Sequence, residues 1–148
     1  MAAPATEQDV CAYLQAQSLG WATPLNFNGA GAINLFASLV LPSSQDGNEG
    51  GVPAQAVFVA ATGGPAPIPY LGRAGSYYQP TIQARIRSNP GDQAGGLALA
   101  RLVRDALHEA VISGYVGALL EQPEPLPLGA DGRNCYGWSV NVRLLRAG

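Results

Sequence analysis

Residues 77–87 read YYQPTIQARIR and residues 88–111 read SNPGDQAGGLALARLVRDALHEAV, and the change of pattern between them decides the fold. In the first segment apolar side chains alternate with polar ones, which predicts a strand with one face in a core. After a turn at 88–92 the spacing becomes helical, and a strand and helix that are each apolar on one side should pack together. The predicted inner stripe of the helix is Leu99, Leu102, Val103, Ala106, Ala110 and Val111, and its outer stripe is Arg101, Arg104, Asp105 and His108.

The remaining elements are predicted to complete one small domain around this unit. A helix is expected from Thr6 to about Ser18, and strands over residues 33–41, 56–60 and 136–144, with a further strand compatible with 115–122. Residues 42–54 and 62–76 are predicted as long loops. We therefore expect a single α+β domain over residues 1–148. Its sheet should be antiparallel or mixed, of about four to five strands, with two helices packed on one face.

The composition narrows the possible functions. The chain has 148 residues, a net charge of −2, eight arginines and no lysine. The absence of lysine argues against a P-loop or a Schiff-base enzyme, and the mild acidity argues against a conventional nucleic-acid binder. No apolar run approaches the roughly 18 residues of a membrane span, and no secretory signal is visible. Only 12% of residues are charged, which favours a large neutral surface in contact with other chains.

No residue pattern predicts catalysis. His108 lies on the polar stripe without a recognisable nucleophile or orienting carboxylate, so we expect a solvated histidine. Arg101 and Asp105 are predicted to pair along the helix, and the carboxylates lack metal-ligand spacing. We expect no catalytic residue, no metal and no cofactor. Cys11 and Cys135 are interpreted as two buried free thiols, with a disulfide as the alternative.

One surface of the predicted sheet is the strongest candidate for a function. Arginines project from the polar side of the central strand, and the final strand would extend that polar surface if it joins the same sheet. The surface is either plain solvated sheet or a face that docks on an identical neighbour or lines a pore; arginine suits such contacts. The candidate interface or lumen residues are Gln83, Arg85, Arg87, Arg101, Asn141 and Arg143.

Four segments, in order, resemble a family of bacteriophage minor capsid and tail-terminator proteins. YQPTIQARIR at 78–87, followed by ALARLVRDALH at 98–108, resembles the core pattern of that family, aromatic-x-Pro-x-Ile/Val-Gln-Val-x-Val-Arg before a helix ending Ile-Arg-Asp-Ala-Leu-His. VFVAATGGP at 57–65 resembles its second strand and Thr-Gly-Gly turn, although Ala61 stands where the family often has an acidic residue. PLGADGR at 127–133 and WSVNVR at 138–143 resemble its C-terminal end.

The resemblance implies a non-enzymatic virion protein at the head–tail neck. It implies a ring, commonly of six copies, that caps the tail tube and joins it to the head, with the tail-tube protein and head-closure or adaptor proteins as partners. The genome would pass through the ring without sequence-specific binding, no membrane would be involved, and assembly would take place in the host cytoplasm. The alternatives are a head-completion or adaptor neck protein, or a small ligand-binding or enzymatic domain that uses residues 62–76 as a pocket lid.

Overall fold

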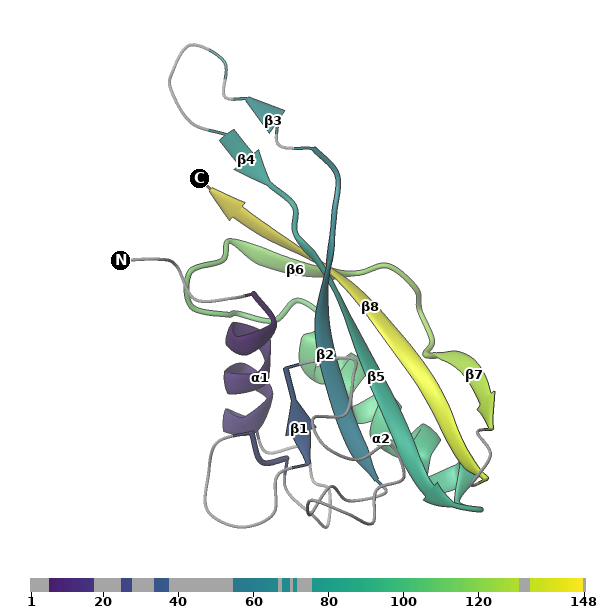
Figure 1. Ribbon diagram of the computed structural model, residues 1–148. Coiled ribbons are helices and arrows are strands. Elements are labelled where there is room, and N and C mark those ends of the chain that lie inside the picture. The colour runs from purple at the N-terminus through teal and green to yellow at the C-terminus, as the bar shows by residue number, and fades with distance from the viewer. Residues whose placement is uncertain are drawn as a thin grey trace.

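The computed structural model describes residues 6–17, 25–27, 34–37, 55–66, 68–69, 71, 76–130 and 134–147. Within these ranges it contains two helices and eight strands (Figure 1). The helices are α1 (Thr6–Ala16) and α2 (Gln93–Leu107). The strands are β1 (Leu35–Phe36), β2 (Ala56–Gly63), β3 (Ile68–Pro69), β4 (Ser76–Tyr78), β5 (Thr81–Pro90), β6 (Gly117–Leu120), β7 (Leu126–Ala130) and β8 (Cys135–Ala147).

All eight strands belong to one sheet in the order β1-β2-β5-β8-β4-β3, with β6 and β7 also paired to β8. The β1–β2 pair is parallel and every other pair is antiparallel, so the prediction of a mixed sheet is confirmed. The predicted number of four to five strands was too low. Two of the added strands lie in segments without a strand prediction, β3 in the predicted loop at 62–76 and β7 from the end of the proline cluster onward. The third is β4, which separates from β5 within the strand predicted at 77–87.

The expected central strand over 77–87 is two strands, β4 and β5, separated by Gln79 and Pro80. Proline has no N–H to donate to a neighbouring strand, so the ladder is interrupted there. The Pro80 carbonyl still accepts a hydrogen bond from Leu144 N at 2.8 Å, which keeps the chain beside β8. Along β5 the predicted alternation is confirmed, because Ile82 and Ile86 are buried while Arg85 is exposed.

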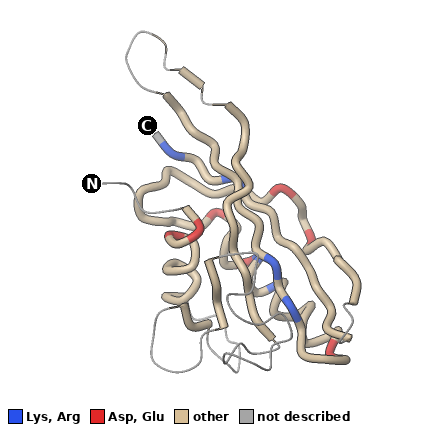
Figure 2. Tube along the Cα trace, in the orientation of Figure 1, with Lys and Arg blue, Asp and Glu red and all other residues tan. Residues whose placement is uncertain are grey.

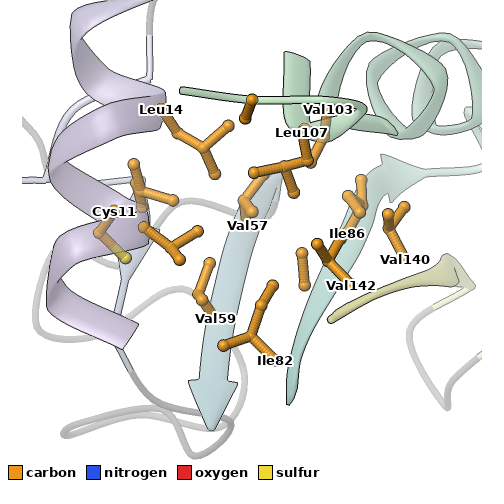
Figure 3. Close-up of a cluster of buried hydrophobic side chains, with 14 of the residues drawn as sticks. Cys11, Leu14, Val57, Val59, Ile82, Ile86, Val103, Leu107, Val140 and Val142 are labelled. Atoms are coloured by element: carbon orange, nitrogen blue, oxygen red, sulfur yellow. The ribbon is translucent and has the colours of Figure 1, made fainter. Parts of the chain in front are cut away.

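Both helices pack on the same face of the sheet, as expected. Their buried side chains meet those of β2, β5 and β8 in one continuous cluster (Figure 3). Tyr13 Oη of α1 also donates a hydrogen bond to the Ala106 carbonyl of α2 at 2.9 Å, which ties the helices to each other. The labelled members of the cluster are Cys11, Leu14, Val57, Val59, Ile82, Ile86, Val103, Leu107, Val140 and Val142.

Helix α2 begins and ends at identifiable signals. Asp92 precedes it, and its Oδ1 accepts a hydrogen bond from Gly95 N at 3.0 Å, which satisfies one of the free N–H groups of the first turn. The helix ends at Leu107 rather than near Val111. Val111 therefore lies outside the helix and is 87% exposed, so its predicted place on the inner stripe is wrong. Leu99 and Val103 are buried as predicted.

Gly96 sets how closely α2 approaches the sheet. A Cβ added at this position would lie 2.4 Å from Cζ3 of Trp138 on β8 and 2.6 Å from Cβ of Ser88 on β5. Both distances are far below van der Waals contact. The glycine therefore lets the first turns of α2 lie directly on the Trp138 ring.

The other predicted elements differ mainly in length. The first helix was expected to run from Thr6 to about Ser18 and ends at Ala16, and the final strand was expected at 136–144 and extends over Cys135–Ala147. The strand expected at 115–122 is β6. Of the strand expected at 33–41, the structure describes β1, while residues 38–41 and the predicted loop at 42–54 lie outside the described residues.

A hairpin arm extends the sheet beyond its helix-covered part. It consists of β3 and β4, which pair with each other through Ile68↔Tyr77 and Pro69↔Ser76. In Figure 1 the arm lies at the top, far from both helices. The end of β8 reaches it, since Tyr78 pairs with Arg146 and the Arg146 guanidinium lies 5.3 Å from the centre of the Tyr78 ring.

Candidate functional site

The face of the sheet opposite the helices carries most of the predicted interface residues. Strand β8 pairs directly with β5, with Gln83 opposite Asn141 and Thr81 opposite Arg143. Side chains opposite each other in a ladder share a face, so Gln83, Arg85, Arg87, Asn141 and Arg143 all project from this side. Both described helices lie on the other side of the sheet. We call this surface the open face.

A row of side-chain amides runs across the open face. Gln83 Nε2 on β5 donates to Asn141 Oδ1 on β8 at 3.3 Å, and Asn141 Nδ2 donates to Gln122 Oε1 at 3.1 Å. Gln122 lies just after β6, so the row links three neighbouring segments. Neutral hydrogen bonds of this kind fix side-chain positions without adding charge.

The arginines of the open face have different surroundings. The Arg143 guanidinium lies 3.7 Å from Glu121 Oε2 and donates to Gln79 Oε1 at 3.4 Å. The Arg87 guanidinium lies 5.5 Å from the centre of the Phe58 ring. Arg85 is exposed and makes no hydrogen bond or ion pair with the residues that the structure describes. Among these residues, Glu121 is the one carboxylate on a face with three arginines.

Apolar side chains lie between and beside these polar groups. Leu119 stands opposite Arg143 and is 49% exposed, and Leu126 stands opposite Ser139 and is 40% exposed. At the β1 edge the rings of Phe36 and Phe58 stack with centroids 5.4 Å apart. The open face thus combines arginine, amide and exposed apolar groups, a composition typical of protein–protein contact surfaces.

Arg101 does not belong to this group. It lies on α2, in the helix layer, and its Nε is 3.3 Å from Glu124 Oε2. Arg104 binds the same carboxylate at 3.0 Å and also pairs with Asp105 at 3.0 Å. The predicted Arg101–Asp105 ion pair is therefore wrong, because Arg101 pairs with Glu124 and Asp105 pairs with Arg104. Both Arg101 and Glu124 are more than half exposed, so their pair contributes little to stability.

The described residues contain no arrangement typical of an active site. His108 is exposed as expected, and its Nε2 is 3.9 Å from Glu109 Oε1. No group of three or more described His, Cys, Asp or Glu side chains is placed to hold a metal ion. A surface depression of about 600 Å³ lies between α2 and the β6–β7 connection, lined by residues that include Arg104, His108 and Gln122. It is not beneath the hairpin arm, where the pocket-lid alternative would place a ligand.

The two cysteines are buried thiols that are not joined in a disulfide, as predicted. Burial, assisted by the negative charge of Glu7, raises the pKa of the Cys11 thiol to about 12. Such a thiol is almost entirely protonated at neutral pH and is a poor nucleophile. Separately, none of the described helices has the length and apolarity needed to cross a membrane.

Comparison with solved structures shows that this fold occurs in a known protein. The chain resembles a chain from a structure described as the virion of a native gene transfer agent particle, with a TM-score of 0.58 and 17% sequence identity. The similarity covers 97% of this chain and 96% of the other, so the two share their fold over nearly their whole lengths. The fold is thus one used by a virion component.

The family follows from the sequence. The family model of the bacteriophage tail terminator protein matches residues 39–146, and this chain belongs to that family. The resemblance found in the sequence motifs is thereby confirmed. The protein is a structural protein of a phage-like virion, and its family is not a family of enzymes. No curated protein matches the chain.

Proposed function

We propose that this protein forms a ring that terminates the tail tube at the head–tail neck and joins the tail to the head. The observation that carries the proposal is the family match, which spans α2 and nearly all of the sheet from β2 to β8. Tail termination requires a subunit that binds copies of itself and the end of a tube.

Two features of the structure support self-association and partner binding. The open face offers a sheet surface with arginine and exposed leucine side chains, which suits a contact with another chain. The hairpin arm adds a second surface at a distance from the helix layer, with Ile68 52% exposed. In this proposal the subunits are identical, commonly six, and the arm and loops contact the tail-tube or the head-closure proteins.

The experiment that tests the proposal measures assembly. Native mass spectrometry and sedimentation of the purified protein should show a closed oligomer, and negative-stain images should show rings. Added to growing tail tubes, the protein should stop elongation and appear at one end of each tube. A chain that stays monomeric at all concentrations and neither caps nor binds tubes would contradict the proposal. Binding to DNA-filled heads without binding to tubes would favour the head-completion or adaptor alternative.

A further inference from the structure

Among the described residues, basic and acidic side chains gather on opposite sides of this two-layer domain. On the open face, the arginines outnumber the single described carboxylate, Glu121. Figure 2 marks the arginines of β5 as blue segments along that strand, and the pairing of β5 with β8 places their side chains on the open face. Arg85 in particular is exposed and makes no ion pair with any described residue. Counted over the described residues, this side therefore has more positive than negative side chains.

In the helix layer, a second group of residues carries an excess of negative charge. Glu7 and Asp9 lie in the first turn of α1, and Glu109 follows α2 (Figure 2). A hydrogen bond links α1 to the segment between α2 and β6, since Tyr115 Oη donates to Asp9 Oδ2 at 2.9 Å. None of these three carboxylates has an arginine partner among the described residues, in contrast to Asp105 and Glu124.

Exposed apolar side chains accompany both groups. Val111 is 87% exposed and Val116 is 73% exposed, and both belong to the connection that follows Glu109. On the open face the corresponding residues are Leu119 and Leu126, 49% and 40% exposed. We call Glu7, Asp9, Glu109, Val111 and Val116 together the acidic flank. The two surfaces are thus complementary in charge and alike in having exposed aliphatic groups.

We infer that the open face of one subunit binds the acidic flank of the next copy of the same chain. The inference rests on the proposed ring and names its contact. A closed ring with a rotation axis needs a heterologous interface, in which two different patches of one chain meet. Opposite sides of a two-layer domain meet this requirement. Arginine on the open face would donate paired hydrogen bonds to the neighbour's carboxylates, with the aliphatic groups packed between them.

The charge of the open face favours a contact with the neighbouring subunit over a position lining the pore. If the open face lined the lumen, every copy would point its arginines at the passing polyanion, and the ring would hold DNA by an attraction that salt weakens. A surface through which a genome must slide gains nothing from such retention. Binding to the carboxylates of a neighbouring subunit instead compensates both groups of charges.

The test reverses the charges of each surface separately and then together. Arg85→Glu with Arg87→Glu should raise the protein concentration for half-assembly at least about tenfold, and so should Glu7→Lys with Glu109→Lys. Asp9 is left unchanged because it accepts the hydrogen bond from Tyr115. A chain carrying all four substitutions should form rings again. The matched control is Arg101→Glu, the same charge change on the other side of the domain, which should assemble like the unmodified protein.

Folding is checked in each variant by circular dichroism and thermal melting. If the double variant has a lowered melting temperature, Arg85→Glu alone replaces it in the assembly test. The Arg85 side chain is exposed and makes no hydrogen bond or ion pair with a described residue, so this change should not disturb folding. Rings formed by either double variant at the normal concentration would overturn the inference and leave the proposed function intact. So would a four-substitution chain that folds but stays monomeric, or an Arg101→Glu chain that loses assembly equally.

Two further results separate the remaining possibilities. Loss of duplex DNA binding by Arg85→Glu, with ring formation unchanged, would place the open face in the lumen and overturn the inference. An unmodified protein that forms no ring, alone or on tail tubes, would refute the proposed function itself, and the named contact with it.

Discussion

Replacing Gly96 by alanine tests whether α2 lies as close to the sheet as the structure indicates. In an exposed helix the change would raise the free energy of unfolding by about 1 kcal/mol, since alanine is the better helix former. Here the new methyl group would lie 2.4 Å from Cζ3 of Trp138 and 2.6 Å from Cβ of Ser88. Neither the indole ring nor a Cβ next to the backbone can turn away. Overpacking of this kind costs about 1–3 kcal/mol, and we expect the upper part of that range.

The overpacking cost minus the gain in helix propensity gives a net loss for Gly96→Ala of about 1–2 kcal/mol in the free energy of unfolding. Urea unfolding, followed by circular dichroism, should show a midpoint lowered by about 0.5–1 M at an unchanged slope. The matched control is Ala98→Gly, at an exposed position of the same helix, which measures the helix-propensity term by itself.

A double variant isolates the contact. Trp138→Leu removes the ring atoms that the new methyl group would strike, at the cost of a cavity. In that background Gly96→Ala should be less harmful than in the unmodified protein by about 1 kcal/mol or more. The reasoning is refuted if Gly96→Ala stabilises the unmodified protein by the amount that the Ala98→Gly control indicates, or if the two substitutions are additive.

Three further predictions concern the core, the cap and pH. Ile82→Asp should abolish the cooperative melting transition, because it places an unpaired charge at a fully buried position. Asp92→Ala should lower the free energy of unfolding by about 1 kcal/mol in urea titrations, because Gly95 N loses its capping oxygen. Because the Cys11 pKa is raised from 9.0 to about 12, the folded state holds a proton that the unfolded state releases, so the contribution of Cys11 to stability should be constant below pH 9 and fall between pH 9 and 12. Urea unfolding across that range should show a shallower fall for Cys11→Ala, and an equal fall would contradict the burial of the thiol.

The sequence predicts the fold best where one pattern runs for long enough. Strand β5 and helix α2 follow clear two-residue and helical periods, and the alternation along β8 places it correctly beside β5. The class of fold and the side covered by helices follow from these three elements. Val111 was misplaced because the helical stripe continues past Leu107, where the backbone leaves the helix, and a hydrophobic pattern alone does not mark that end.

Strands made of unusual residues were missed for physical reasons. Strand β7 contains Pro127 and Gly129, two residues that normally interrupt strands. They are tolerated because, among the described strands, β7 lies at an edge and pairs with β8 alone. The short strands β3 and β4 depend on each other for their hydrogen bonds, so their local sequence is a weak signal.

The placement of most candidate residues on one face was predicted from the sequence, while their role as interface or lumen residues stays a prediction. Period-two alternation places Gln83, Arg85 and Arg87 on one side, and pairing of β5 with β8 brings Asn141 and Arg143 beside them. Arg101 was predicted on the polar stripe of the helix as helix support or a rim contact, and in the structure it lies on α2, in the layer on the other side of the sheet. The acidic flank had no sequence signal, since Tyr115 joins segments more than 100 residues apart.

The position of β8 in the chain determines when the sheet can be completed during synthesis. It is the last described strand to be made, yet β4, β5, β6 and β7 all pair with it. Until residues 135–147 leave the ribosome, the earlier strands lack the partner that completes their ladder, and their apolar side chains cannot be fully covered. The sheet of this domain can therefore be completed only after residues 135–147 have been synthesised.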